Sequence, residues 1–133
     1  MPRRLNLLPA IALAASLVAP LAHAANDDAR GSSCIDSRKL EEWKSPSPNV
    51  IYYRVGTSAI FRLDLSTGSN QLRYSDVILT TNVRSPSFWL CTPQDFQLRV
   101  TDSHHTFTEP LIVKAITRLT PDEVAAIPPE YRP

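Results

Sequence analysis

Residues 49–66 constrain the fold of this chain more than any other stretch, because they predict a β-hairpin with one favoured register. Two segments rich in Val, Ile, Tyr, Phe and Leu flank a Gly-Thr-Ser connection at residues 56–58, a pattern typical of paired antiparallel strands. A three-residue loop keeps the apolar side chains on one face, whereas a shift of one residue would mix the faces. The expected pairs are Val55 with Ala59, Tyr53 with Phe61, Ile51 with Leu63, Tyr52 with Arg62 and Val50 with Asp64.

The two faces of this hairpin differ in chemistry, and the difference predicts which face is buried. We expect the apolar face to lie in the core of the protein. On the opposite face, the ring of Tyr52 lies beside Arg54 and Arg62. The predicted core face consists of Ile51, Tyr53, Val55, Phe61, Leu63 and Leu65.

The first 24 residues have the pattern of a secretory signal peptide. Arg3 and Arg4 precede a largely apolar run over residues 5–21, and residues 22–24, Ala-His-Ala, supply a small-x-small cleavage signal. One alternative is a transmembrane anchor, which the prolines and modest length of the run disfavour. Another is twin-arginine export, whose motif the sequence matches poorly. We expect cleavage before Ala25 and, since no cysteine lies at that point, no lipid anchor.

Cleavage there leaves 109 of the 133 residues, enough for one small domain with a modest core. We expect a flexible leader over residues 25–33, a single domain over residues 34–133, and a periplasmic or secreted location. Without Arg3 and Arg4, 12 of the 14 basic residues remain against 13 acidic ones, and the charges are interspersed. This balance argues against nucleic acid and against an anionic membrane surface as partners.

The chain contains two cysteines, Cys34 and Cys91. In an exported protein an even number of cysteines indicates a disulfide, and two cysteines allow one pairing. Two buried free thiols or a redox pair are the alternatives, although the Cys-x-x-Cys spacing of thiol oxidoreductases is absent. We therefore expect a structural disulfide between Cys34 and Cys91.

Short apolar or alternating segments separated by turn residues follow one another along the rest of the domain. This spacing predicts an all-β fold, a small antiparallel barrel or sandwich of about six strands. Turns are expected at residues 45–48, 67–70 and 84–87, and a loop at residues 101–108. Besides the hairpin, the expected strands are an irregular one over residues 34–43 and others over residues 72–82, 88–91, 95–101 and 111–119.

The C-terminus predicts a short helix with a well-defined start. Thr120 is a good N-cap, Pro121 suits the first helical position, and Glu123 completes a capping box. The two prolines at residues 128–129 end the helix. We expect its apolar side to pack on the sheet, through Val124 and Ile127.

Several segments together form a further pattern. They are residues 33–36 (Ser-Cys-Ile-Asp) with Trp43, residues 53–56 (Tyr-Arg-Val-Gly), 61–65 (Phe-Arg-Leu-Asp-Leu), 90–91 (Leu-Cys) and 119–128, which contain Leu-Thr-Pro-Asp-Glu-Val. In this order they resemble a family of small exported proteins of Gram-negative bacteria that is classed as a domain of unknown function. The resemblance spans nearly the whole mature chain. It implies an exported protein and brings no assigned activity.

The chain departs from the pattern of this family at two positions. Similar proteins carry two further cysteines, one near residues 69–70 and one near residues 109–110, and both are absent here. If those two cysteines pair with each other elsewhere, their joint absence leaves Cys34 and Cys91 as partners. The resemblance thus implies the same disulfide as the cysteine count.

Aromatic and arginine side chains provide the candidate binding residues. Tyr52, with Arg54 and Arg62 beside it on the face opposite the core, is the leading candidate. Trp43 and Trp89 are further aromatic candidates that would line the same groove, together with the neighbouring phenylalanine at position 88. The alternative is that a second layer, such as the C-terminal helix, covers this face.

The sequence contains no recognisable catalytic or metal-binding motif, and we expect no catalytic residues, metal or cofactor. His104 and His105 follow Asp102, but neighbouring residues of an extended segment point to opposite sides, and no third ligand has metal-site spacing. A G-x-S-x-G nucleophile motif and a glycine-rich phosphate loop are absent. Asp64 and Asp76 would act as a carboxylate pair only if the fold brought them within several ångströms.

These patterns favour a non-enzymatic binding or envelope-accessory module that contacts an envelope protein or a small ligand. The alternative is a small periplasmic hydrolase that uses residues such as Asp95, Asp102, His104 or His105. A pocket joining a histidine to one of these carboxylates would favour the hydrolase, and scattered positions would argue against it. A purely structural or stress-induced role is the third hypothesis.

Overall fold

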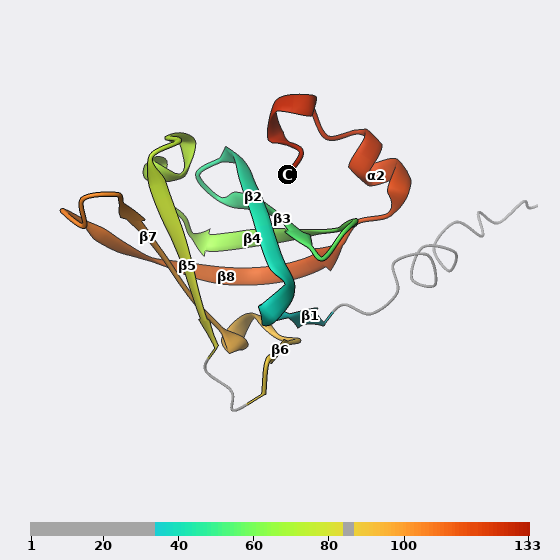
Figure 1. Cartoon of the computed structure of the whole chain (residues 1–133), viewed down its shortest axis with the longest axis horizontal. Coiled ribbons are helices and arrows are strands. Elements are labelled where there is room, and N and C mark those ends of the chain that lie inside the picture. Colours follow the sequence, from blue (N-terminus) through green and yellow to red (C-terminus); the bar gives the residue numbers. More distant parts are fainter. Residues whose placement is uncertain (1–33, 84–86) are drawn as a thin grey trace, which may run out of the picture.

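The computed structural model describes residues 34–83 and 87–133 of the chain (Figure 1). The predicted signal peptide, the whole of the predicted leader and residues 84–86 of the predicted turn lie outside the described residues, so the structure does not address them. Antiparallel strands dominate the described part, and they confirm the predicted all-β fold. None of the helices described is long and apolar enough to cross a membrane.

The hairpin predicted at residues 49–66 has the predicted register. Strands β3 (Val50–Val55) and β4 (Ala59–Thr67) form all five of the expected pairs. Gly56 begins the loop with a φ of 61°, a left-handed conformation that a residue without a Cβ adopts at little cost. The predicted core face is buried, apart from Val55, which is partly buried at the end of its strand.

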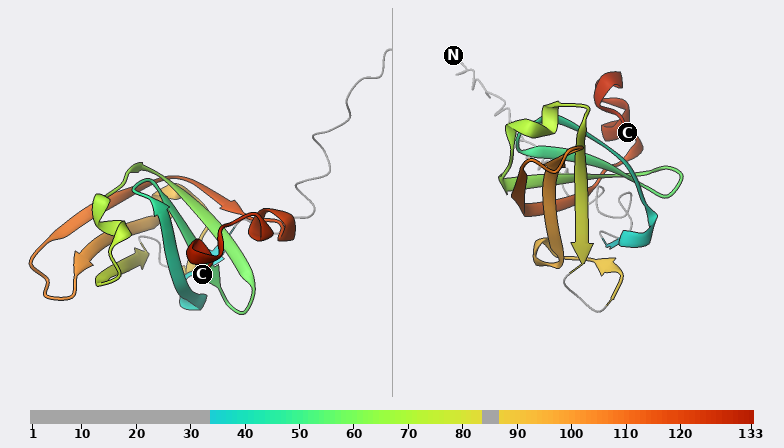
Figure 2. Two further views of the ribbon diagram at one scale, coloured as in Figure 1. Left: turned by 90° about the horizontal axis from the view of Figure 1, so that it is seen from above. Right: turned by 60° about the vertical axis from the view of Figure 1, so that its left-hand side comes forward.

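Besides the hairpin, the described residues form six strands: β1 (Ile35–Asp36), β2 (Leu40–Ser47), β5 (Val77–Val83), β6 (Trp89–Leu90), β7 (Phe96–Asp102) and β8 (Thr108–Arg118). One sheet has the order β2-β3-β4-β8-β7-β5, and β1 pairs with β6 in a separate ribbon. The large sheet curls into a half-barrel (Figure 2). Its two edges, β2 and β5, are not hydrogen-bonded to each other.

The hydrophobic core lies inside this curl. Strand β7 shows the predicted alternation, since Phe96, Leu98 and Val100 are all buried. The hydroxyl group of Tyr53 on β3 lies 3.2 Å from the hydroxyl oxygen of Thr81 on β5. Because β3 and β5 are not neighbours in the sheet, this hydrogen bond crosses the interior of the half-barrel and holds its two sides together.

Two predicted boundaries are wrong, for reasons that lie in the tertiary structure. The turn predicted at residues 45–48 is shorter, because β2 continues to Ser47. Pro46 fits within β2 because an edge strand needs no ladder hydrogen bond on its outer side. The strand predicted from residue 72 begins only at Val77, since a 3-10 helix, η2 (Asn70–Arg73), precedes it and buries Leu72.

The irregular strand predicted over residues 34–43 consists of two strands. A 3-10 turn, η1 (Ser37–Lys39), separates β1 from β2. The carboxylate of Asp36 accepts hydrogen bonds from the guanidinium group of Arg38 at 2.9 and 2.8 Å and from its backbone N–H at 3.1 Å. The guanidinium contact is the main reason why the pKa of Asp36 falls to about 2. Asp36 thus stays ionised and fixes the turn.

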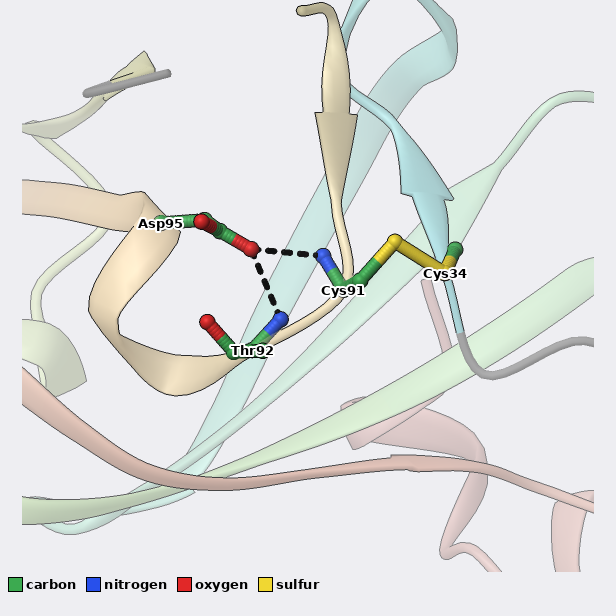
Figure 3. The surroundings of a disulfide bond; sticks show 4 residues. All are labelled: Cys34, Cys91, Thr92 and Asp95. Atoms are coloured by element: carbon green, nitrogen blue, oxygen red, sulfur yellow. Dashed lines mark hydrogen bonds between the residues drawn. A yellow bond between two sulfur atoms is a disulfide. The ribbon is translucent and has the colours of Figure 1, made fainter.

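The predicted disulfide joins Cys34 and Cys91, which are 57 residues apart and flank the β1–β6 ribbon (Figure 3). Beside it, the carboxylate of Asp95 accepts backbone hydrogen bonds from Thr92 at 2.8 Å and Cys91 at 2.9 Å. These bonds, with that from Thr92 first, lower the pKa of Asp95. The covalent link and this carboxylate together hold the start of the domain against the segment that leads into β7.

The segment after β4 and the beginning of β8 meet in this fold. Ser69 is buried, and its hydroxyl group donates a hydrogen bond to the carboxylate of Glu109. This contact joins the segment after β4 to the beginning of β8. A polar contact therefore connects these two segments of the chain.

The predicted C-terminal helix, α2 (Pro121–Ala125), has the expected cap. The hydroxyl oxygen of Thr120 accepts the backbone N–H of Glu123, and the Glu123 carboxylate accepts the backbone N–H of Thr120. The chain then continues into a final 3-10 turn, η4 (Pro129–Tyr131). Ile127, between the two, is buried as predicted, whereas Val124 is only partly buried.

Replacing both cysteines, by Cys34→Ser with Cys91→Ser, is expected to lower the free energy of unfolding by about 2–4 kcal/mol, because the disulfide restricts the unfolded chain. Urea unfolding of the oxidised, reduced and doubly substituted proteins measures this loss. Cys34→Ser alone is expected to leave a free thiol at Cys91 that reacts with a thiol reagent, because Cys91 is exposed. Two free thiols in the native protein would contradict the pairing.

Gly68→Ala is expected to destabilise the fold more than Gly56→Ala does. A Cβ at position 68 would lie 1.8 Å from the carbonyl oxygen of Pro48, whereas a Cβ at position 56 meets nothing within 4 Å. The first substitution must displace the turn between β2 and β3, at a cost of about 3 kcal/mol. The second adds only left-handed backbone strain, about 1–2 kcal/mol. Equal losses in urea unfolding would argue against the close approach at Gly68.

Candidate functional site

The five residues predicted for binding lie in three separate places. Tyr52, Arg54 and Arg62 share the outer face of the β3–β4 hairpin, as expected. Trp43 lies on the core side of β2 and packs against the hydrophobic core. Trp89 lies in the β1–β6 ribbon, next to the disulfide. The fold therefore does not join these side chains in one groove.

Ion pairs occupy much of the outer face of the hairpin. The guanidinium group of Arg62 donates hydrogen bonds to Asp64 at 2.9 and 2.8 Å, and that of Arg54 donates one to Glu42 at 3.3 Å. The C-terminal segment borders the same face and leaves a hollow of about 250 Å³ beside Tyr52. A second layer thus covers part of this face, and both arginines already have carboxylate partners.

The aromatic side chains next to the disulfide form a second surface. Phe88 and Trp89 are 55% and 50% exposed, and the guanidinium carbon of Arg38 lies 4.7 Å from the centre of the Phe88 ring. Trp89 borders a hollow of about 570 Å³ that also includes Cys34 and the β3–β4 loop. This hollow is distinct from the surroundings of Trp43.

A third site, a cleft of about 450 Å³, lies on the open side of the half-barrel between the two edge strands. Its volume is within the range of about 300–1,000 Å³ that is usual for ligand pockets. The interior-facing side chains of Leu40, Trp43 and Leu79 are only partly buried there. The cleft is lined by Ser37, by Leu40, Glu41 and Trp43 from β2, by Val77, Ile78, Leu79 and Thr81 from β5, and by Tyr53.

The cleft combines apolar side chains with a lining surface that is mostly polar. Glu41 is exposed and is the one charged residue among those that line the cleft. Tyr53 is 4% exposed, and burial raises the pKa of its phenol to about 12, although the hydrogen bond to Thr81 acts in the opposite direction. The phenol is therefore neutral at physiological pH. Such a site suits recognition of a ligand that carries both apolar and polar groups.

The residues of the hydrolase hypothesis do not form a catalytic arrangement. Asp95 and Asp102 lie at opposite ends of β7, about 20 Å apart for a strand of this length. The carboxylate of Asp102 binds the hydroxyl and backbone N–H groups of Thr106 and the backbone N–H of Phe107, which lowers its pKa, chiefly through the Thr106 side chain. It therefore stabilises the loop before β8. His104 and His105 are exposed in that loop.

The remaining carboxylates do not form a pair or a metal site. Asp64 lies on β4 and Asp76 directly before β5, and two strands separate β4 from β5 in the sheet. The carboxylate of Asp64 accepts hydrogen bonds from Arg62 on the outer face of the hairpin, and Asp76 is exposed. Within residues 34–83 and 87–133, no group of three or more His, Cys, Asp and Glu side chains can hold a metal ion.

Sequence reasoning found Trp43 but missed the residues that join it in the cleft, notably Leu40, Leu79 and Thr81. Their apolar and β-branched character was consistent with strands. The signal that identifies the cleft is that β2 and β5 are both edges, and this depends on the strand order.

Comparisons with protein-family models, with curated proteins and with solved structures found no match.

Tyr53→Phe is expected to change how stability depends on alkaline pH. Because the folded-state pKa is raised from 10.0 to about 12, the neutral phenol stabilises the fold fully below pH 10. This contribution, about 3 kcal/mol, is lost as the pH rises to 12. The variant is expected to lose about 1 kcal/mol at neutral pH, with its hydrogen bond, and to show a smaller alkaline loss.

Urea unfolding between pH 7 and 12 measures this difference. Tyr52→Phe, which lies on the opposite face of the same strand, is the matched control and is expected to keep the wild-type alkaline curve. Identical curves for Tyr53→Phe and the wild type would contradict the burial of the phenol.

Proposed function

We propose that this protein is an exported, non-enzymatic binding module that holds its ligand in the cleft between β2 and β5. The signal-peptide pattern, the disulfide and the resemblance to exported proteins support an oxidising compartment outside the cytoplasm, the periplasm or the secreted fraction. The geometry of the half-barrel supports the cleft as the ligand site.

The observation that carries this proposal is the open seam of the sheet. Side chains that face the interior, Trp43 and Leu79 among them, remain half-exposed because β2 and β5 do not pair. A ligand in the cleft buries this apolar surface, which is favourable because it is removed from water. The outer face of the hairpin is a weaker candidate for the ligand site, because its arginines already bind carboxylates.

The chemistry of the carboxylates supports a binding role over a catalytic one. Asp36, Asp95 and Asp102 each accept hydrogen bonds from nearby backbone N–H groups and thereby fix turns. The pKa of each is lowered, whereas a general acid at neutral pH needs a raised pKa.

Site-specific photo-crosslinking in intact cells tests the proposal. A photoreactive residue at position 41, on the rim of the cleft, is expected to yield a reproducible adduct that mass spectrometry identifies. The same residue at position 114, exposed in the central strand β8 and outside the cleft, is the matched control and is expected to yield none. Equal adducts at both positions, or none at position 41, would contradict a ligand site in the cleft.

A further inference from the structure

The free edge of β5 borders the same cleft, and its backbone indicates what kind of ligand fits. We propose that the ligand is an extended peptide segment of a partner protein, which pairs with β5 as an added strand. This inference rests on the proposed function, because it places the ligand in the cleft, and it specifies the chemical class of that ligand.

Strand β5 has the features of an edge that accepts another strand. Its sequence over Val77–Val83, Val-Ile-Leu-Thr-Thr-Asn-Val, contains no charge, proline or glycine. It pairs with β7 without interruption at all seven positions, so its other side presents a regular row of backbone N–H and C=O groups. Proteins usually protect such edges with charges, prolines or bulges. In β5 none of these is present.

Strand β2, on the other side of the cleft, is protected by all of these devices. It contains Pro46, which lacks a backbone N–H, and the charged residues Glu41, Glu42 and Lys44. Its register with β3 is irregular at two places. The contrast between the two edges indicates that β2 resists pairing whereas β5 remains available.

The side chains of β5 that face the cleft alternate along the strand, as the side chains of an extended peptide do. Val77, Leu79 and Thr81 are two residues apart and line the cleft, which the exposed Ile78 between them also borders. An added strand has the same alternation, so every second side chain of the peptide enters the cleft and packs between Leu79 and Trp43. In this mode of recognition, the main-chain hydrogen bonds provide affinity and the pockets for alternate side chains provide specificity. Contact with Leu79 and Trp43 favours apolar side chains at those positions.

The charge of the cleft adds a second preference. Glu41 is its one charged lining residue, it is exposed, and none of the ion pairs in the described residues includes it. The neighbouring Glu42 is paired with both Lys44 and Arg54. A peptide with Lys or Arg beside its apolar residues is therefore complementary to the rim of the cleft.

The position of β2 favours a single strand over a second copy of this protein. A second copy that paired through its own β5 would bring its β7 directly behind that strand, about 4.8 Å further on. The continuation of the curled sheet is occupied there by β2, which lines the same cleft as β5. A lone peptide strand has no second strand behind it and fits the seam.

The probe for this proposal is a capped peptide with the sequence Lys-Val-Thr-Val-Thr-Val-Lys. Its three valines share one face, and its terminal lysines are complementary to Glu41. Titration into the oxidised mature protein, followed by amide NMR, is expected to show saturable binding with shifts in β5. Hydrogen exchange is expected to slow at those amides of β5 that point to the free edge. No binding at millimolar peptide would overturn the inference.

Two N-methylated peptides separate strand pairing from simple hydrophobic contact. One carries methyl groups on the valine amides and the other on the threonine amides, so each blocks one edge of the peptide while the side chains stay the same. Pairing with β5 through one edge predicts that one of them loses affinity by about tenfold or more and the other does not. Equal affinities of the two methylated peptides would overturn the inference.

Two substitutions on β5 provide matched controls in the protein. Leu79→Lys changes a side chain that lines the cleft, and Thr80→Lys changes the adjacent exposed residue, which is not among the residues that line it. Only the first is expected to weaken binding, by about tenfold, while thermal unfolding verifies that both variants fold. Equal weakening by both variants would contradict the proposed pose.

The results also separate this inference from the proposed function. A crosslinked adduct at position 41 that contains a lipid, a glycan or a small molecule would retain the binding module and overturn the peptide ligand. A stable dimer through β5 without added peptide, seen by sedimentation and by hydrogen exchange, would overturn the choice of a partner peptide over a second copy.

Discussion

A single sheet must bury its apolar face against something, and the six-stranded sheet of this protein meets that requirement by curling on itself. The core consists of side chains that alternate along the strands and meet inside the curl. The hydrogen bond between Tyr53 and Thr81 connects the two sides of the half-barrel across this core. The disulfide and the C-terminal segment lie outside this core. The shape of the interior, and therefore the cleft, depends on this curl.

The curl stops short of closure, and the two edges that remain are not equivalent. Strand β2 carries a proline, charges and an irregular register, all of which discourage pairing. Strand β5 is regular and uncharged. Closed barrels have no edges, so a protein that needs only stability gains from closure. The open seam leaves apolar side chains half-exposed, and this favours a role for the cleft in binding.

The polar side chains of this protein serve mainly to hold turns in place. Asp36, Asp95 and Asp102 lie at the ends of strands and accept hydrogen bonds from neighbouring backbone groups. The pKa of each carboxylate is lowered, chiefly by the side chain of Arg38 for Asp36, by the backbone of Thr92 for Asp95 and by the side chain of Thr106 for Asp102. The stability that these contacts contribute is therefore present at neutral pH and is lost as the pH falls through the lowered pKa values. These three carboxylates thus hold turns in place through the hydrogen bonds that they accept.

The sequence by itself determined the features that depend on neighbouring residues. The register of the β3–β4 hairpin, the alternation along β7 and the capping box at Thr120 were all predicted correctly, because a two-residue period and a capping pattern are local. The disulfide followed from there being only one possible pair. Only the tertiary structure decided which strands are edges, because that depends on the order β2-β3-β4-β8-β7-β5, in which strands distant in the chain become neighbours. The inward orientation of Trp43, the place of Pro46 and the cleft all follow from that order.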